Sequence, residues 1–328
     1  MNGPGRSPNA EVRGVTCCVL RVPLVACVRR NTQHATRPTS EFGLRASLLV
    51  SLLSFCLLLV PAAAFAHGEL HLAILALTKQ IAAATNNPAR LYLDRGDLHR
   101  LHANWPAAAA DYSRAAELDP TLATVDVSRA RLLADSGQLD AALTMFGKAI
   151  ARSPRDGEAF IGRARVLVKL GRRKPAITDY RHGLGLLEKP APECYLECAQ
   201  QQAAEGQQAA ALRCLDLGVE RLGPLVKLQS YAFELELARQ HLDSALARLD
   251  TIIANASRPE TWLAKRGDLL LALGKPALAR QSFRAALQAI NKLPLLLQRA
   301  PHTEKLKATA TAALAEIRDA PAVLTATP

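Results

Sequence analysis

The sequence predicts an all-α solenoid in which about six two-helix hairpins stack in a row. Three observations support this fold class. Pro120 and Pro154 end two segments whose landmarks match at a spacing of 34 residues. Small and aromatic residues recur at that same interval, which is typical of stacked supersecondary units. Aromatic residues make up only 4% of the 328 residues, and alanine and leucine are abundant, which favours close-packed helices over a β-sandwich.

The repeat pattern is clearest when units are numbered from residues 89, 123 and 157. Positions 8, 20 and 27 are small and position 24 is aromatic. The residues at positions 8, 20, 24 and 27, in that order, are Gly96, Ala130, Ala164; Ala108, Ala142, Ala176; Tyr112, Phe146, Tyr180; and Ala115, Ala149, Gly183. Small residues let two helices approach closely, and the aromatic residue fills the gap toward the next hairpin.

The later units follow the pattern less closely. In the fourth unit, residues 192 to 224, Leu215 replaces the aromatic residue. In the fifth, residues 226 to 259, Phe233 occupies the position that should be small, which leaves the register of that unit open. The sixth unit, residues 260–290, fits again, with Gly267 and Phe283 at positions 8 and 24.

This pattern resembles the tetratricopeptide repeat (TPR) family over roughly residues 89–290. The stretch LYLDRGDLHRLHANWPAAAADYSRAAELDP reads as one full unit, with proline at position 32. The resemblance implies a right-handed superhelical solenoid with N- and C-terminal capping helices and a concave inner wall. The opening HGELHLAILALTKQI is also similar to a group of exported bacterial TPR proteins, which implies export but no reaction.

The ends of the chain divide into four further segments. Residues 1–66 are interpreted as a leader and signal peptide, because the apolar run 46–66 ends in the small-x-small pattern of Ala64, Phe65 and Ala66. Cleavage after Ala66 predicts a periplasmic or secreted bacterial protein. The alternative is that the apolar run is not cleaved and anchors the chain in a membrane, which would be its one membrane contact. Residues 67–88 are expected to form an N-terminal cap helix, 291–319 an insertion and C-terminal capping helix, and 320–328 a disordered tail.

The sequence favours binding over catalysis. It has no glycine-rich phosphate loop, no G-x-S-x-G, no H-E-x-x-H and no aspartate-rich metal loop. We therefore expect that the protein is not an enzyme. A hydrolase whose active site matches none of these motifs is an alternative hypothesis. The formal net charge is +12, but export and the lack of an arginine-rich tract argue against nucleic acid. A protein or peptide ligand, possibly acidic, is the expected partner.

Family geometry implies which residues face the inner wall. They combine apolar side chains with arginines and a lysine, which suits an extended or helical peptide with carboxylates. The alternative is that the arginines are solvated or pair with Asp97 and Asp135. The chain lacks the lysine and asparagine set of the family's carboxylate-clamping members. The expected groove residues are Leu93, Asp97, Arg100, Leu101, Val127, Arg131, Asp135, Ile161, Arg165, Val168 and Lys169.

Positions 7 and 23 predict contacts across each hairpin. Arg95 with Asp111, and Arg163 with Asp179, are expected to form structural ion pairs. In the fourth unit the same positions hold Cys198 and Cys214. A disulfide between them is the hypothesis for an exported protein, and buried free thiols are the alternative. Cys194 would remain single.

Histidines near the predicted new N-terminus suggest a second function. If cleavage frees the amino group of His67, its amine and imidazole together with His71 are ligands that suit Cu(II). A copper-binding protein is therefore the alternative to a peptide-binding scaffold that needs no cofactor. His99 and His102 belong to the first repeat, which the cap helix should contact.

Overall fold

The computed structural model describes residues 62–319, with side chains over 69–317. This part of the chain contains helices and no strand, so the all-α prediction is confirmed. The helices are α2 (Ala62–Ala83), α3 (Ala89–Leu101), α4 (Trp105–Leu118), α5 (Thr124–Asp135), α6 (Leu139–Arg152), α7 (Gly157–Lys169), α8 (Arg173–Leu186), α9 (Pro192–Ala204), α10 (Gln208–Leu222), α11 (Val226–Ala238), α12 (Leu242–Asn255), α13 (Glu260–Ala272), α14 (Pro276–Asn291), α15 (Leu295–Gln298) and α16 (Pro301–Asp319).

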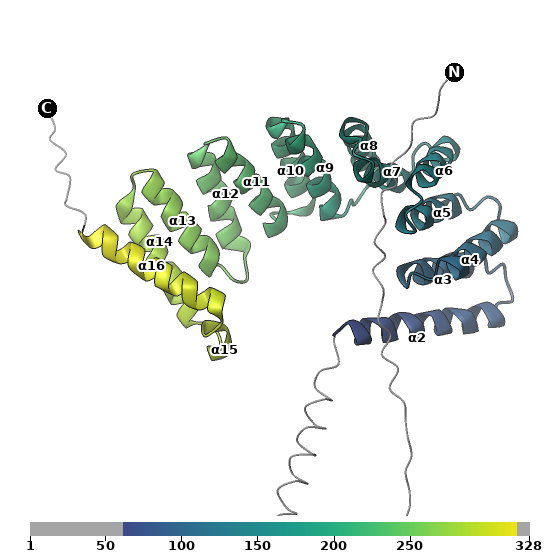
Figure 1. Ribbon diagram of the computed structural model, residues 1–328, viewed down its shortest axis with the longest axis horizontal. Helices are drawn as coiled ribbons and strands as arrows, with labels where there is room; N and C mark the ends of the chain where they lie inside the picture. The colour runs from purple at the N-terminus through teal and green to yellow at the C-terminus, as the bar shows by residue number, and fades with distance from the viewer. Residues whose placement is uncertain (1–61, 320–328) are drawn as a thin grey trace, which may run out of the picture. The chain divides into compact units, whose positions relative to one another are not determined.

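Six antiparallel hairpins run from α3–α4 to α13–α14 (Figure 1). The second helix of each hairpin also packs against the first helix of the next. First helices touch directly as well, α3 with α5, α5 with α7 and α9 with α11. Each hairpin therefore buries its two faces against its neighbours in sequence, as expected of a superhelical repeat fold.

The end helices seal the stack. α2 packs on α3, and α16 packs on α14 and α13. α2 begins at Ala62, five residues before the predicted start of the cap helix at 67, and so runs through the predicted cleavage point. Within residues 62–319, none of the helices is both long and apolar enough to cross a bilayer. Residues 1–61, with most of the apolar run, and the predicted tail at 320–328 lie outside the described residues.

The turns inside the hairpins need a residue in the left-handed backbone region. Gly137 has φ of 84° and Gly171 has φ of 72°, a conformation that glycine adopts without steric cost. The first hairpin differs from these two. Ala103, with φ of 57°, takes the left-handed position. Asn104 instead caps α4, where its side chain accepts a hydrogen bond from the Ala107 amide at 3.4 Å.

The small residues explain how closely the helices pack. A Cβ added to Gly96 would lie 2.6 Å from the ring of Tyr112, and one added to Gly162 would lie 2.4 Å from the ring of Phe146. Ala108 and Ala142 are fully buried. The aromatic residue of position 24 thus contacts both its own hairpin and the next, as the sequence pattern predicted.

The predicted ion pairs across two hairpins are confirmed. Arg95 donates to both carboxylate oxygens of Asp111, at 2.8 and 2.6 Å. Arg163 does the same to Asp179, at 2.7 and 2.8 Å. Both aspartates are buried, so these forked contacts satisfy carboxylates that would otherwise be desolvated without partners.

Candidate functional site

The first helices α3, α5 and α7 carry the predicted groove residues, but the apolar residues at position 5 are not available to a ligand. Leu93, Val127 and Ile161 are only 3%, 4% and 0% exposed. The expected apolar stripe is therefore wrong. Position 5 faces the second helix and the next hairpin, so these side chains belong to the core. Leu101, at 60% exposure, and the half-buried Val168 are the apolar groove residues that remain accessible.

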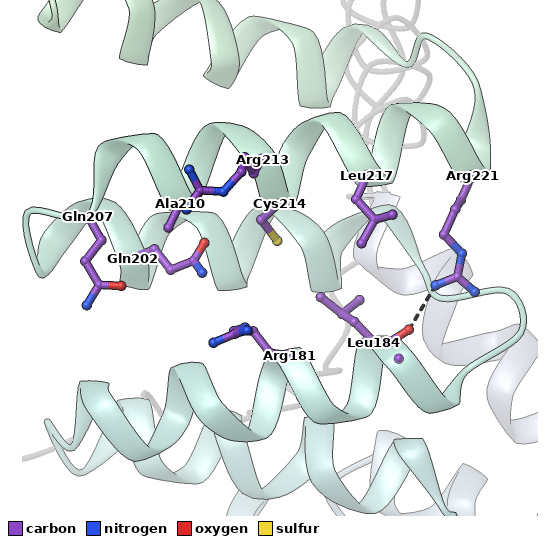
Figure 2. Close-up of a pocket in the computed structure, with 10 residues that line it drawn as sticks. Arg181, Leu184, Gln202, Gln207, Ala210, Arg213, Cys214, Leu217 and Arg221 are labelled. Atoms are coloured by element: carbon purple, nitrogen blue, oxygen red, sulfur yellow. Dashed lines mark hydrogen bonds between the residues drawn. The ribbon is translucent and has the colours of Figure 1, made fainter.

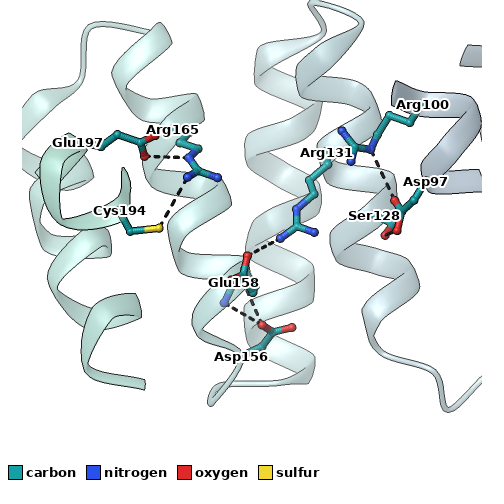
Figure 3. Close-up of polar contacts among 10 residues, drawn as sticks. Asp97, Arg100, Ser128, Arg131, Asp156, Glu158, Arg165, Cys194 and Glu197 are labelled. Atoms are coloured by element: carbon teal, nitrogen blue, oxygen red, sulfur yellow. Dashed lines mark hydrogen bonds and ion pairs between the residues drawn. The ribbon is translucent and has the colours of Figure 1, made fainter. Parts of the chain in front are cut away.

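The predicted basic residues are accessible, and they join neighbouring hairpins. Arg131 on α5 donates to Glu158 Oε2 on α7 at 2.6 Å (Figure 3). Arg165 on α7 donates to Glu197 Oε2 on α9 at 2.9 Å. The alternative that the groove arginines form ion pairs is thus observed. Arg131 and Arg165 pair with glutamates, however, rather than with Asp97 and Asp135.

Arg100 completes this ladder of ion pairs. Its guanidinium bonds Asp135 on the next hairpin and lies 3.6 Å from Asp97. Burial is the largest influence and lowers the pKa of Arg100, but the hydrogen bond to Asp135 and the negative charges of Asp135 and Asp97 together raise the pKa above its usual value. The pKa of Arg165 is raised in the same way, with burial opposed by the bond to Glu197. These groups therefore remain charged.

Two tyrosines at position 24 hold the carboxylates of this ladder. The Tyr112 hydroxyl donates to Asp97 Oδ1 at 2.8 Å, and the Tyr180 hydroxyl donates to Glu197 Oε2 at 3.1 Å. Burial first, and then the neighbouring carboxylate, raises the pKa of each phenol. The phenols therefore remain neutral donors, and Asp97 is the acceptor for Tyr112 rather than a free groove carboxylate.

An open cavity of about 590 Å³ lies over this ladder, between α5, α7 and α9. Four cationic side chains and two carboxylates line it, so its charge is positive. The Lys169 ammonium contacts the Ala134 carbonyl at 3.5 Å and has no carboxylate partner within the described part of the chain. The polar and charged side chains that line it include Arg100, Arg131, Asp135, Arg165, Lys169, Glu197, Gln200 and Gln201.

Sequence reasoning missed part of this cavity. Glu197, Gln200 and Gln201 line it and Glu158 pairs with the lining residue Arg131, yet the sequence pattern predicted none of these roles. The repeat could have indicated Glu158 and Glu197, because an acid on the first helix of one hairpin can reach an arginine on the first helix of the hairpin before it. The amides carried no such signal.

The predicted disulfide partners face each other across the fourth hairpin. Cys198 is fully buried on α9 and Cys214 is half-buried on α10, and both are free thiols here. The two thiols are close enough for each to shift the pKa of the other. Cys194 is also a free, buried thiol, and its sulfur accepts from Arg165 at 3.7 Å. The disulfide stays a prediction.

The copper hypothesis also stays a prediction. The side chain of His67 lies outside the described residues, and His71 is exposed on α2. Among side chains 69–317, no three or more His, Cys, Asp or Glu are grouped so as to hold a metal ion. His99 instead lies 3.9 Å from Asp111, and burial lowers its pKa despite that carboxylate.

Comparison with known proteins agrees with this architecture. A family model described as tetratricopeptide repeat matches residues 127–181 and 232–294, the second of which spans the fifth and sixth hairpins. No curated protein matches the sequence.

Solved structures of similar fold include the C-terminal part of a TPR repeat-containing protein from Cytophaga hutchinsonii. It is 15% identical, with a TM-score of 0.50, covering 71% of this chain and 98% of that one. PilF from Pseudomonas aeruginosa is 13% identical, with a TM-score of 0.48, covering 67% and 97%. YrrB, described as a TPR protein with an unusual peptide-binding site, is 18% identical, with a TM-score of 0.44, covering 59% and 97%. At 15% identity and a TM-score of 0.50, the likeness to the Cytophaga hutchinsonii protein supports the fold alone.

The stacked hairpins and the family match define the class as an all-α helical-repeat scaffold. Residues 127–181 and 232–294 of this chain match the tetratricopeptide repeat family. Proteins of this fold commonly mediate protein interactions.

Proposed function

We propose that this protein is a non-enzymatic scaffold that binds an acidic segment of a partner protein on its concave face, in the cavity between α5, α7 and α9. The observation that carries the proposal is the positive charge of that cavity. Its arginines are held by ion pairs, while Lys169 has no carboxylate partner among the described residues. A ligand carboxylate is the group that would complete this arrangement.

The other lining groups suit a polypeptide. The side-chain amides of Gln200 and Gln201 supply donors and acceptors that an extended backbone can use. The arginines are fixed in place by Glu158 and Glu197, so they contribute a field without having to be reoriented on binding. An acidic partner is therefore attracted by the whole wall and held chiefly at Lys169.

The test compares two labelled peptides of equal length, one of alternating Glu and Leu and one of alternating Lys and Leu. Fluorescence anisotropy should show tighter binding of the acidic peptide, weakening with added salt. Lys169→Glu should weaken binding at least about tenfold, or about 1.4 kcal/mol. Lys174→Glu on the exposed face of α8 is the matched control and should change little. Equal affinity for both peptides, or no effect of Lys169→Glu, would refute the proposal.

We also propose that the mature protein is exported to the periplasm or beyond. The supporting feature is the apolar run 46–66 with its small residues before His67. Expression in a bacterial host, followed by N-terminal sequencing of the periplasmic fraction, tests this. A mature chain beginning at His67 is the expected result, and a full-length cytoplasmic chain would contradict export.

A further inference from the structure

A second cavity, of about 460 Å³, lies between α8, α9 and α10 on the second-helix side of the stack. Figure 2 shows Arg181, Gln202 and Cys214 around the same space. Leu184 and Leu217 supply its apolar wall. Neither the peptide-binding proposal nor the repeat pattern uses this cavity.

The sulfur in this cavity is one of a pair. Cys214 lines the opening, while Cys198 lies behind it and is fully buried. Cys214 Sγ also lies 3.7 Å from the Tyr195 carbonyl oxygen. A reagent in the cavity can therefore meet Cys214 but not Cys198, which can react only through Cys214.

Electrostatics favour ionisation of the outer thiol. The hydrogen bond from Cys198 lowers the pKa of Cys214, burial opposes it, and the positive charge of Arg181 lowers it further. The hydrogen bond to Cys214 and burial raise the pKa of Cys198. The thiolate, which is the nucleophile in disulfide exchange, thus forms on the accessible sulfur.

Within the described residues, two guanidinium groups at the cavity make no polar contact that stabilises the fold. Arg181 and Arg213 make no hydrogen bond or ion pair within residues 62–319, and both are exposed. Arg221 is a contrast, because it donates to the Leu184 carbonyl at 2.9 Å and the Leu187 carbonyl at 2.7 Å. Arg181 and Arg213 are therefore free to bind a ligand carboxylate.

A buried amide also lacks a partner here. Gln202 is only 4% exposed, and its Oε1 atom accepts no hydrogen bond from the described residues. A buried acceptor without a donor is unfavourable. A ligand that brings an N–H group would satisfy it.

We propose that Cys198 and Cys214 form a redox-active dithiol that reduces small, carboxylate-bearing disulfides entering this cavity. Arg181 and Arg213 bind the carboxylates, and Gln202 Oε1 accepts an amide N–H of a peptide-like ligand. The ligand class is thus a low-molecular-weight anionic peptide disulfide.

The reaction takes two exchange steps. The Cys214 thiolate attacks one sulfur of the ligand R–S–S–R, which forms a Cys214–S–S–R mixed disulfide and releases R–S⁻. Cys198 then releases its proton to solvent and attacks the Cys214 sulfur, which forms the Cys198–Cys214 disulfide and releases a second R–S⁻. The protein dithiol loses two electrons, and the ligand disulfide gains them to give two thiolates.

The test uses the full chain and two disulfide reagents, anionic 5,5′-dithiobis(2-nitrobenzoate) and neutral 2,2′-dithiodipyridine. Quenched samples are mapped by peptide mass spectrometry, so that Cys214 is followed separately from the other cysteines. Cys214 should react much faster than the buried Cys194. The wild-type chain should end with a Cys198–Cys214 disulfide, whereas Cys198→Ser should retain the aryl group on Cys214.

The arginines are tested with the same reagents. The double variant Arg181→Gln, Arg213→Gln should slow modification of Cys214 by the anionic reagent about tenfold or more, because local positive charge concentrates anions. The neutral reagent should react within about twofold of the wild-type rate, and Arg284→Gln on α14 is the control. Cys214 reacting no faster than Cys194, a persistent mixed disulfide in the wild type, or equal slowing with both reagents would overturn the proposal.

Discussion

The fifth and sixth hairpins solve the same packing problem with opposite choices of side chain. In the sixth, Gly267 on α13 lies under the ring of Phe283 on α14, and a Cβ at Gly267 would come within 2.6 Å of that ring. In the fifth, the large residue is Phe233 on α11, and the aromatic position holds Leu249 on α12. Phe233 and Leu249 are 4% and 0% exposed and belong to one core cluster.

The difference shows that the repeat constrains the combined volume at the helix crossing rather than one residue at one position. A bulky Phe233 breaks the sequence pattern, yet α11 and α12 keep the bounds expected for a hairpin. Ala245 remains fully buried in the same cluster, so the second small position is kept. Volume-conserving exchanges of this kind are the changes that cores tolerate best.

Removing either aromatic ring should have the largest effect. Phe283→Ala and Phe233→Ala should each lower the free energy of unfolding by about 3–5 kcal/mol, because each leaves a cavity in a buried cluster. Denaturant unfolding followed by circular dichroism measures the loss, and hydrogen exchange locates it, since repeat arrays can unfold in parts. Leu278→Ala, at a residue 45% exposed on α14, is the control. A loss below about 1 kcal/mol for Phe233→Ala would show that it does not replace the missing aromatic residue.

Transferring the side chains of the fifth hairpin to the sixth tests whether the two positions share one volume. Gly267→Phe alone should overpack against Phe283 and destabilise by about 1–3 kcal/mol or more. Combining it with Phe283→Leu should cost less than the sum of the two single changes, with a coupling of about 0.5–3 kcal/mol. A double-mutant cycle of unfolding free energies measures this coupling. Strict additivity would mean that the two positions do not share one volume.

The turns offer a smaller contrast. The fifth hairpin turns through Gln240 at φ of 58°, whereas the sixth turns through Gly274 at φ of 68°. Gln240→Gly should stabilise by about 1 kcal/mol, because the left-handed conformation is costly for residues with a Cβ. Gly274→Ala should destabilise by a similar amount. Thermal melting of both variants checks the signs, and a stability loss in Gln240→Gly would show that its side chain matters more than its backbone.

Much of the fold could be predicted from the sequence because helical repeats are encoded locally. The period of 34 residues, the small residues such as Ala142, and the pairing of Arg95 with Asp111 all followed from residue spacing. The site could be predicted only in part. Arg131, Arg165 and Lys169 do line a cavity, but Leu93 and Ile161 are core residues. Spacing alone did not separate the half of a helix that faces solvent from the half that faces the next hairpin.

By itself the sequence determined the class of fold and the order of its hairpins, because each helix contacts mainly its neighbours in the chain. Only the tertiary structure decided which charges are already paired. The bonds from Arg131 to Glu158 and from Arg165 to Glu197 depend on the rotation between successive hairpins. The same rotation sets the cavity that exposes Cys214 beside Arg181. That rotation results from the sum of many side-chain contacts at each interface, and so no single motif reveals it.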